Sequence, residues 1–545
     1  MALVYPNRYS VGMSNLGFQT VYRLLNEYDH VVCERAFLSE ADEPSGRPIR
    51  TLEQDRVLTD FDIIAFSVSF ENDFPNILTI LESAGLPLRS SRRGSPHPLV
   101  IVGGVAGWIN PEPISDFIDC FIIGEAEAIL PEFLERFDPD EERGQMLIDL
   151  ARNVPGTYVP SLYAVDYHSN GTVKRFEPVV DVPEKIKKVI ARDLSNIPTC
   201  SVILTPNTTF GQTYLIEVSR GCPHGCRFCS AGYIYRPPRF RPVELLKQCI
   251  ADGVALTDRI GLVGAAVSDL PGIGELCASV DKDTVRLSFS SLRADALNEE
   301  LIAALAGSGM KTATIAPDAG SQRMRDIINK GLAEDQILHA AEALVAAGIP
   351  NLKLYFMIGL PFEKTEDVEA VSGLCRKIKH HFLKSSRVRK RIGDITVSVN
   401  PFVPKPFTPF QWAGMNDLRD IKQKIRKIRN DLRKVPNVRV FSGTPRWSYI
   451  QTLFSRGDRR VSNILEAAHR NRWNWAQTLK ASPINPDFFV YGTRSEDEIL
   501  PWDFIDHGVR KSYLIKEFKR AKSVLPSGEC GKKSCRICGA CNGSV

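Results

Sequence analysis

Short apolar runs alternate with helix-like segments along the first 137 residues. The run at residues 61–70 is almost continuously hydrophobic and is followed by the helix-like stretch 76–86, and a second apolar run covers residues 99–108. This alternation predicts an α/β fold in which a doubly wound parallel sheet is flanked by helices. Ligands of such folds bind at the carboxyl ends of the strands. Those ends are expected at residues 7–17, 67–72, 103–113 and 124–127.

The pattern changes at residue 138. Residues 138–211 contain an acidic stretch, several prolines and two β-like runs on either side of Asn170-Gly171. An Asn-Gly pair between such runs is a strong signal for a hairpin turn. We therefore expect a connector that contains a β-hairpin.

A strand–helix rhythm returns at residue 212 and continues to residue 410. Six apolar strand-like runs are separated by helical segments, which predicts a partial (β/α)6 barrel of the TIM type with its active face at the carboxyl ends of the strands. Apolar residues then recur at steps of three and four from Leu418 to Leu432, as in an amphipathic helix. Residues 411–525 are expected to form a mainly helical C-terminal domain, and residues 526–545 a cysteine-rich tail.

Length and composition are typical of a packed protein of several domains. The chain has 545 residues, of which 43% are hydrophobic and 24% charged. This length predicts two to four domains. Its longest apolar runs reach about half of the roughly 18 residues that a membrane helix needs, so they indicate buried strands and no insertion into a membrane. The N-terminus has no basic leader followed by an apolar stretch, which favours a cytoplasmic location.

The charge distribution gives little support to a nucleic-acid partner. The net charge of +5 is small for this length. Residues 376–391 contain eight Lys or Arg and no acid, a pattern that could follow a phosphate backbone. A solvated helix with a charged loop explains the same pattern and is preferred. RNA is therefore a substrate class that we do not favour.

The cysteines point to metal chemistry. Seven of the thirteen cysteines fall into two tight clusters, which in a reducing compartment is typical of metal sites. Cys222, Cys226 and Cys229 follow an apolar strand in a loop with glycine and proline, spaced C-x3-C-x2-C. Three converging thiolates can hold three irons of a 4Fe-4S cluster and leave the fourth iron open. A zinc site that uses the same cysteines and His224 is the alternative.

This loop resembles the signature of the radical S-adenosylmethionine (SAM) superfamily, in which an aromatic residue, here Phe228, precedes the last cysteine. The resemblance implies an oxygen-sensitive enzyme whose open iron binds SAM. It also implies that an electron cleaves the sulfonium and yields a 5'-deoxyadenosyl radical. The electron would come from a small-molecule donor or from a flavodoxin- or ferredoxin-type reductase.

Further barrel segments resemble the same family. Residues 315–331 are similar to the segment whose carboxylate, small residues and arginine line the cofactor pocket. Residues 288–295 and 261–266 are similar to strand ends near the ribose, the carboxylate and the methionine amine. By this resemblance the cofactor-binding residues, besides Phe228, are Gly264, Ser290, Arg293, Asp318, Ser321 and Arg325. The resemblance names no catalytic residue for the step on the substrate.

The N-terminal unit, residues 1–137, resembles the cobalamin-binding domain that precedes the barrel in one branch of this superfamily. Gly103, Gly104 and Gly124 could let the backbone approach a corrin, or could simply form tight turns. The Asp-x-His-x-x-Gly motif, whose histidine would bind cobalt, is absent from this unit. The residues leave the presence of cobalamin open.

Four further metal-ligand candidates lie in the tail: Cys530, Cys535, Cys538 and Cys541. Their last three members have ferredoxin-like spacing and favour a second iron–sulfur cluster, with zinc as the alternative. The whole layout is similar to an uncharacterised family of radical SAM proteins. We expect radical SAM chemistry, with cobalamin-dependent methylation or rearrangement of an unknown substrate. The alternatives are cobalamin-independent modification of RNA or protein, and a non-catalytic metal-binding or electron-transfer protein.

Overall fold

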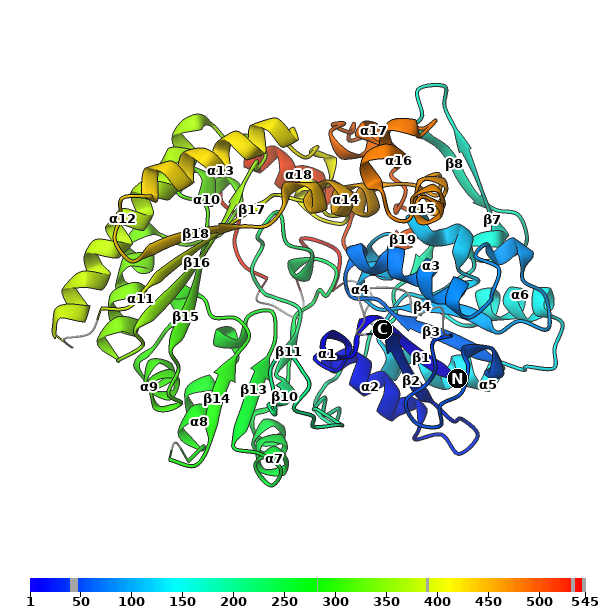
Figure 1. Ribbon diagram of the computed structural model, residues 1–545, viewed down its shortest axis with the longest axis horizontal. Coiled ribbons are helices and arrows are strands. Elements are labelled where there is room, and N and C mark those ends of the chain that lie inside the picture. Colours follow the sequence, from blue (N-terminus) through cyan, green and yellow to red (C-terminus); the bar gives the residue numbers. More distant parts are fainter. Residues whose placement is uncertain (40–47, 282, 389–391, 531–534, 542–545) are drawn as a thin grey trace. The chain divides into compact units, whose positions relative to one another are not determined.

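The computed structural model describes residues 1–39, 48–281, 283–388, 392–530 and 535–541. The chain forms two compact units (Figure 1). The first comprises residues 1–192, 201–212 and 450–508, and the second comprises residues 193–200, 213–449 and 509–545. Residues 411–525, which the sequence suggested as one helical domain, are thus shared between the two units.

The first unit is built on a six-stranded sheet in the order β2-β1-β3-β4-β5-β6. All neighbouring strands pair in parallel except β5 and β6, which are antiparallel. The apolar runs predicted as strands form β3 and β4, whose first four residues are buried. The predicted α/β class is confirmed. The strands are β1 (Ala2–Arg8), β2 (Glu34–Leu38), β3 (Ile63–Ser67), β4 (Leu99–Gly103), β5 (Cys120–Ile122) and β6 (Thr157–Tyr158).

Helices follow most of these strands, and further helices come from residues 445–490, of which residues 445–449 belong to the second unit. The predicted hairpin is present, with β7 (Tyr163–Tyr167) antiparallel to β8 (Val173–Pro178), and β9 (Ile186–Lys187) pairs with β19 (Ile505–Asp506). The helices are α1 (Tyr9–Gly12), α2 (Leu16–Leu25), α3 (Phe74–Ser83), α4 (Val105–Ile109), α5 (Ala126–Arg136), α6 (Arg143–Asn153), α14 (Pro445–Arg456), α15 (Val461–Arg470), α16 (Trp475–Ala481) and α17 (Asp487–Val490).

Gly104 allows β4 to turn sharply into α4. Its φ is +96°, and an added Cβ would lie 2.5 Å from the carbonyl oxygen of Val68, which accepts a hydrogen bond from the amide of Ala106. A residue with a side chain would be strained by the positive φ at this position. Its Cβ would also clash with backbone atoms of Val68, which cannot move away easily.

We therefore expect Gly104→Ala to lower the free energy of unfolding by at least about 2 kcal/mol. Gly103→Ala is the matched control, because its Cβ would meet no atom within 4 Å. It should change the free energy by less than about 0.5 kcal/mol. Urea denaturation of both variants measures the difference, and equal losses would contradict the role of Gly104.

The second unit contains two parallel sheets, in the orders β10-β13-β14 and β15-β16-β17-β18. The six predicted strands are present. A seventh parallel strand, β18, pairs with β17 in a region where the sequence indicated helices only, so the predicted end of the strand pattern near Pro409 is wrong. The strands are β10 (Tyr214–Glu217), β13 (Arg259–Val263), β14 (Arg286–Phe289), β15 (Thr312–Asp318), β16 (Asn351–Ile358), β17 (Ile395–Pro401) and β18 (Val438–Ser442).

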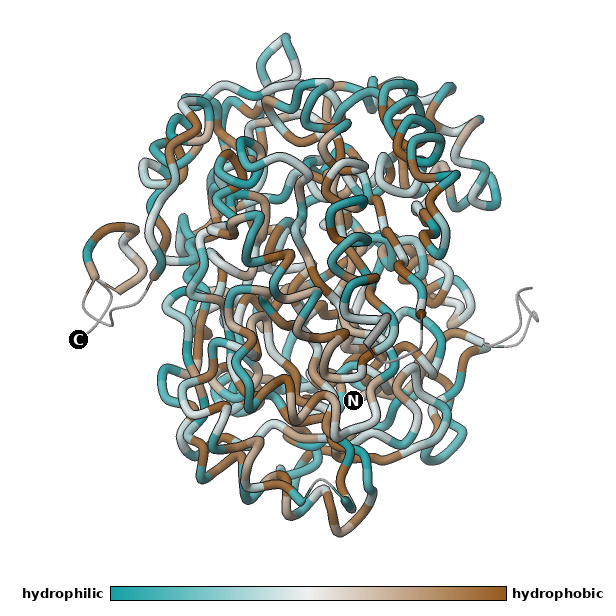
Figure 2. Tube along the Cα trace, turned by 90° about the vertical axis from the view of Figure 1, so that its left-hand side faces the viewer, coloured by the Kyte–Doolittle hydropathy of each residue, from teal (hydrophilic) through white to brown (hydrophobic). Residues whose placement is uncertain are grey.

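The helices of the second unit lie along the outer side of its strands (Figure 1). Apolar residues are brown along the Cα trace in Figure 2. The amphipathic helix predicted from Leu418 is α13. The helices are α7 (Val243–Val254), α8 (Ile273–Ala278), α9 (Glu299–Gly307), α10 (Gln322–Ile327), α11 (Glu334–Ala346), α12 (Thr365–Val388), α13 (Leu418–Leu432) and α18 (Lys511–Lys522).

Some sequence features lie partly outside the described residues. The basic segment 376–391 continues along α12 to residue 388, and residues 389–391 are not described. The same holds for residues 531–534 and 542–545 of the cysteine-rich tail. Among the described residues, no helix combines the length and apolar character needed to cross a membrane.

Candidate functional site

The loop with Cys222, Cys226 and Cys229 leaves the carboxyl end of β10. Its two ends are held together by a short antiparallel pair, β11 (Ser219–Arg220) with β12 (Arg239–Phe240). Gly221 opens the loop with φ of +84°, and a Cβ there would lie 2.8 Å from the carbonyl oxygen of Tyr235. The loop is therefore a closed turn of chain at the edge where partial barrels carry their active sites.

The three thiols of this loop are free and lie close together. Burial raises the pKa of Cys222 to about 12 and that of Cys226 to about 11, and it also raises the pKa of Cys229. Negative charge on Cys226 or Cys229 would raise the pKa of Cys222 further, so the sulfur atoms are within electrostatic range of one another. Binding of iron would have to displace these protons. The donor set of three thiols suits a 4Fe-4S cluster that leaves one iron open.

His224 is not available as a fourth ligand in this conformation. Its Nε2 lies 2.9 Å from a carboxylate oxygen of Asp269, and its Nδ1 lies 2.9 Å from a carboxylate oxygen of Glu529. Both ring nitrogens are thus occupied by carboxylates. This arrangement does not favour the alternative in which zinc binds the three cysteines and His224. Among the described residues, no three Cys, His, Asp or Glu side chains converge as they would around a single metal ion.

Lys330 is a charged residue of the site that sequence reasoning missed. Its ammonium lies 2.6 Å from a carboxylate oxygen of Asp318, at the end of β15. Burial alone would lower the pKa of Lys330, but attraction to Asp318 and to Cys226 outweighs it, so the pKa is raised. The group therefore stays positively charged beside the cysteine loop. Lys330 lies at the end of segment 315–331, which resembles the family segment, and this position could have identified it from the sequence.

Arg293 adds a second cation near the same loop. Its guanidinium forms a two-pronged pair with Asp295, at 3.0 and 2.8 Å, and donates to the carbonyl oxygen of Lys330 at 3.0 Å. Burial would lower the pKa of Arg293, but Asp295 and, to a smaller extent, negative charge on the nearby Cys226 raise it. The structure thus brings the predicted residues Asp318 and Arg293 together around Lys330 and Cys226.

Gly264 and Ser290 also meet, at the carboxyl ends of β13 and β14. The Ser290 hydroxyl accepts a hydrogen bond from the Gly264 amide at 3.1 Å and lies 3.0 Å from its carbonyl oxygen as a donor. A Cβ on Gly264 would lie 2.9 Å from the hydroxyl of Ser219, next to the cysteine loop. This tight contact explains why glycine stands there.

The other predicted cofactor contacts are engaged in contacts within the protein. Arg325 is fully buried, and its guanidinium donates to the carbonyl oxygens of Ala319, Gly320 and Leu332. Ser321 caps α10 by accepting from the amide of Met324. Phe228 packs against the apolar cluster beneath this segment. All three residues have a structural role in the site. Their contact with a cofactor stays a prediction.

Arg227 ties the cysteine loop to the C-terminal part of the chain. Its side chain is fully buried, and its guanidinium lies 3.1 Å from the carboxylate of Glu517 on α18. It also donates to the carbonyl oxygen of Leu525 at 2.6 Å. In Figure 1 the C-terminal segment, in red, lies beside the green loop of the second unit. The loop therefore depends on α18 for its position.

Polar residues also gather at the strand ends of the first unit. Asn7, at the end of β1, donates to Asp73 at 2.8 Å, and Asn15 donates to Ser69 at 2.9 Å. Burial raises the pKa of Asp73 to about 6. In the order β2-β1-β3 these residues flank the point where the winding of the sheet reverses, at which such folds bind ligands.

Two observations bear on the cobalamin expectation for this unit. Cβ atoms on Gly104 and Gly124 would strike the chain's own backbone, at Val68 and Val189, so these glycines are explained by internal packing. The letters Asp-x-His-x-x-Gly do occur in the chain at residues 166–171, outside residues 1–137. They form the exposed tip of the β7–β8 hairpin, with the Gly171 amide donating to the carbonyl of His168, and do not follow β1.

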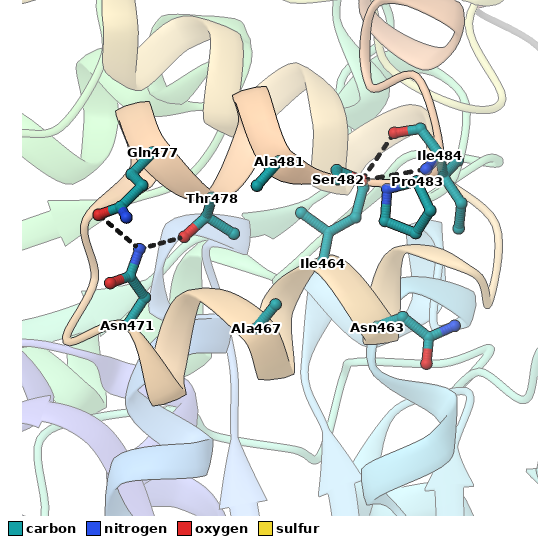
Figure 3. Close-up of a pocket in the computed structure, with 10 residues that line it drawn as sticks. All are labelled: Asn463, Ile464, Ala467, Asn471, Gln477, Thr478, Ala481, Ser482, Pro483 and Ile484. Atoms are coloured by element: carbon teal, nitrogen blue, oxygen red, sulfur yellow. Dashed lines mark hydrogen bonds between the residues drawn. The ribbon is translucent and has the colours of Figure 1, made fainter.

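A separate pocket of about 230 Å³ lies between α15 and α16 of the first unit (Figure 3). Asn471 bonds to Gln477 and Thr478 across one end of it, and Ser482 bonds to the backbone of Ile484 at the other. The ten lining residues carry no ionisable side chain. The pocket therefore offers no acid, base or thiolate for catalysis.

Comparison with known proteins decides the family. The family model described as "Radical SAM proteins, N-terminal" matches residues 17–160, and the model "Radical SAM superfamily" matches residues 216–375. An uncharacterised protein of Methanocaldococcus jannaschii is 32% identical over 471 residues, which cover 86% of this chain and 90% of that protein. The chain belongs to the radical SAM superfamily. It is accordingly an enzyme that uses SAM, and the non-catalytic alternative falls.

More distant relatives match parts of this radical SAM enzyme. A protein of Pyrococcus horikoshii named as an uncharacterised methyltransferase is 22% identical, covering 59% of this chain and 68% of its own length. A tRNA-2-methylthio-N(6)-dimethylallyladenosine synthase of Carboxydothermus hydrogenoformans is 23% identical over 35% of this chain and 46% of its own. The cobalamin-dependent radical SAM enzyme OxsB, a solved structure, aligns with a TM-score of 0.42 and 16% identity over 68% of this chain and 51% of its own.

Proposed function

We propose that this enzyme binds a 4Fe-4S cluster through Cys222, Cys226 and Cys229 and cleaves SAM reductively beside that loop. When bound, the cluster would supply one electron to the sulfonium, so that a carbon–sulfur bond breaks and a radical forms on the released group. The observation that supports the proposal is the meeting of three free thiols, one buried and two half-buried, with Lys330 and Arg293. The protein's own task is to bind, orient and exclude water and oxygen.

The charged residues around the loop suit the amino-acid end of SAM, which carries both an ammonium and a carboxylate. Lys330 and Arg293 offer positive charge for the carboxylate, and Asp318 offers negative charge for the ammonium. Because these groups are largely buried, they would orient the ligand more strongly than the same charges at a surface. Gly264 and Ser290, at the neighbouring strand ends, complete the wall of this proposed cofactor site.

Methyl transfer is the reaction class that we propose, with cobalamin as its carrier in the first unit. The name of the Pyrococcus relative supports methyl transfer, and so does that of a hopanoid C-3 methylase of Methylococcus capsulatus, 27% identical over 37% of this chain and 35% of its own length. The polar strand ends around Asn7, Asn15 and Asp73 support a ligand site in the first unit. Corrinoid bound in stoichiometric amount after expression with cobalamin uptake would support this part, and its absence would leave radical cleavage without cobalamin.

The assay that tests the proposal uses protein purified and reconstituted without oxygen. With a low-potential reductant and SAM, the enzyme should release S-adenosylhomocysteine if it transfers methyl groups, or 5'-deoxyadenosine if it abstracts hydrogen. Release of neither product from protein with a full iron content would contradict the proposal.

Modification of RNA is the second candidate, supported by the name of the Carboxydothermus relative. The basic segment on α12 adds little to it, because several of its described side chains contact carboxylates within the fold. Lys377 contacts Glu334, and both His381 and Lys384 lie 3.2 Å from Glu342 of α11. These contacts join α12 to the neighbouring helix α11, which accounts for the basic side chains without an RNA partner. A salt-dependent affinity for RNA would favour the second candidate.

A further inference from the structure

The peptide bond between Gly225 and Cys226 is held by two buried side chains. The carbonyl oxygen of Gly225 accepts a hydrogen bond from the amide nitrogen of Asn329 at 3.1 Å and another from the hydroxyl of Tyr233 at 3.0 Å. Asn329 is 6% exposed and Tyr233 is fully buried. A carbonyl oxygen has two lone pairs, and both are used here. Because the peptide is planar, these bonds also fix the direction of the Cys226 amide.

Asn329 is itself held in an orientation that suits this contact. Its Oδ1 accepts a hydrogen bond from the amide of Ser527 at 2.7 Å, which leaves its Nδ2 to donate to Gly225. Its φ is +52°, a left-handed conformation that asparagine adopts more readily than most other residues with a side chain. A Cβ on Gly225 would lie 3.0 Å from this Nδ2, so glycine permits the close approach. Both residue types therefore suit the contact.

The end of α10, which precedes Asn329, holds the residue on the other side of Cys226. The carbonyl oxygen of Ile328 accepts a hydrogen bond from the backbone amide of Arg227 at 2.9 Å. The carbonyl oxygen of Ile327 accepts another from the Arg227 guanidinium at 2.8 Å. The residues before and after Cys226 are thus both bound by the same short stretch of chain.

Lys330 follows Asn329 directly and adds a positive charge. Its ammonium lies 2.6 Å from a carboxylate oxygen of Asp318, whose φ of +61° is also left-handed. Residues with a side chain keep such a conformation only where surrounding contacts hold them, and they concentrate at functional sites. Lys330 is also within electrostatic range of Cys226. Segment 318–330 therefore carries this cation and at the same time holds Cys226.

We propose that Asn329 is a positioning residue that fixes Cys226 relative to Lys330. The inference rests on the proposed function, because the purpose of this arrangement lies in the 4Fe-4S cluster. Reduction adds negative charge to such a cluster, and a cation held nearby favours the more negative state. Asn329 thereby raises the reduction potential of the cluster, and Tyr233 supports it through the same carbonyl.

The reduction potential of anaerobically reconstituted protein tests this role in two variants that leave the net charge unchanged. Asn329→Gly keeps the left-handed backbone accessible and removes both side-chain hydrogen bonds, whereas Tyr233→Phe removes only a hydroxyl. Each should shift the potential to a more negative value. For Asn329→Gly we expect about 59 mV, which corresponds to about a tenfold change in the one-electron equilibrium. A redox titration followed by electron paramagnetic resonance gives both values.

Asn351→Gly is the matched control for Asn329→Gly. Asn351 makes the same pair of bonds, since it donates to the carbonyl oxygen of Lys311 at 2.9 Å and accepts from the amide of Asp394 at 2.9 Å. It lies at the amino end of β16, whereas the cysteine loop follows the carboxyl end of β10. The control should lose stability as Asn329→Gly does, but keep the wild-type potential.

Tyr163→Phe is the matched control for Tyr233→Phe. Tyr163 belongs to the first unit, is buried, and donates from its hydroxyl to the carbonyl oxygen of Pro183 at 2.7 Å. Its loss should also leave the potential unchanged. If Asn329→Gly and Tyr233→Phe had the wild-type potential and differed from it only in stability, as the controls should, the positioning role would be overturned.

Hydrogen exchange of the metal-free protein tests the contact without the cluster. Residues 221–230 should exchange roughly tenfold faster in Asn329→Gly than in wild type, because a buried carbonyl loses a donor. Asn351→Gly should leave the exchange of these residues unchanged. This measurement needs neither iron nor SAM, so the two proposals fail separately. Wild type that binds no iron would refute the proposed function, whereas unchanged exchange in Asn329→Gly would overturn the positioning role.

Discussion

Cys226→Ala is expected to reduce SAM cleavage to the background seen without protein. Cys226 is 8% exposed and lies in electrostatic range of Cys222, Cys229, Lys330 and Arg293, at the centre of the candidate site. In the proposed site, three cysteines hold three of the four irons, and the fourth iron has no protein ligand. Removing one cysteine leaves two irons without a protein ligand, so the cluster is expected to be lost. The measurement is the yield of 5'-deoxyadenosine and S-adenosylhomocysteine, together with the loss of about four irons per chain.

The control for this variant is another buried cysteine of the same unit. Cys375 is fully buried on α12 and takes no part in either cysteine cluster. Cys375→Ala should keep both the iron and the product yield, since it removes only a small apolar contact. Normal product formation by Cys226→Ala would refute the proposed cluster site.

Much of the architecture could be read from local sequence pattern. Continuous apolar runs such as 61–70 fit buried strands in a parallel sheet and cannot reach across a membrane, and they form strands as expected. The Asn170-Gly171 turn also formed as predicted, because its signal is local and depends on the left-handed conformation of glycine.

The missed elements are those whose pattern is weak or whose partner is remote. In β18 no residue is fully buried, and it pairs only with β17, so its sequence lacks the apolar run of a central strand. The helices from α15 to α17 belong to the first unit although they follow the barrel in sequence. An amphipathic pattern indicates that a helix packs on something, but does not identify what it packs on.

Site chemistry was predictable where one loop supplies it and not where distant segments meet. The spacing of Cys222, Cys226 and Cys229 lies within eight residues and could be recognised directly. The carboxylates on His224 come from Asp269 and Glu529, and the latter is 305 residues away in sequence. No local sequence pattern predicts a contact between residues so far apart in the chain. The same applies to the burial of Arg227 against α18.

Loss of the Arg227–Glu517 pair is expected to destabilise the second unit strongly. The two side chains are 0% and 5% exposed, and Glu517 also accepts from the hydroxyl of Ser527. Burial lowers the pKa of Arg227, an effect that Glu517 partly offsets, so this carboxylate stabilises the buried guanidinium charge. Removing one partner of a buried ion pair typically costs about 3–5 kcal/mol, because the other charge is left uncompensated.

Glu517→Gln should therefore lower the free energy of unfolding by about 3 kcal/mol in the metal-free protein. Glu369→Gln is the matched control, since its ion pair with Lys427 is exposed and should contribute less than about 1 kcal/mol. Urea denaturation gives both values. Hydrogen exchange localises the effect, because residues 221–230 and 512–527 share the buried arginine and should lose protection together. If Glu517→Gln were as stable as Glu369→Gln, the cysteine loop would not depend on α18 for its position.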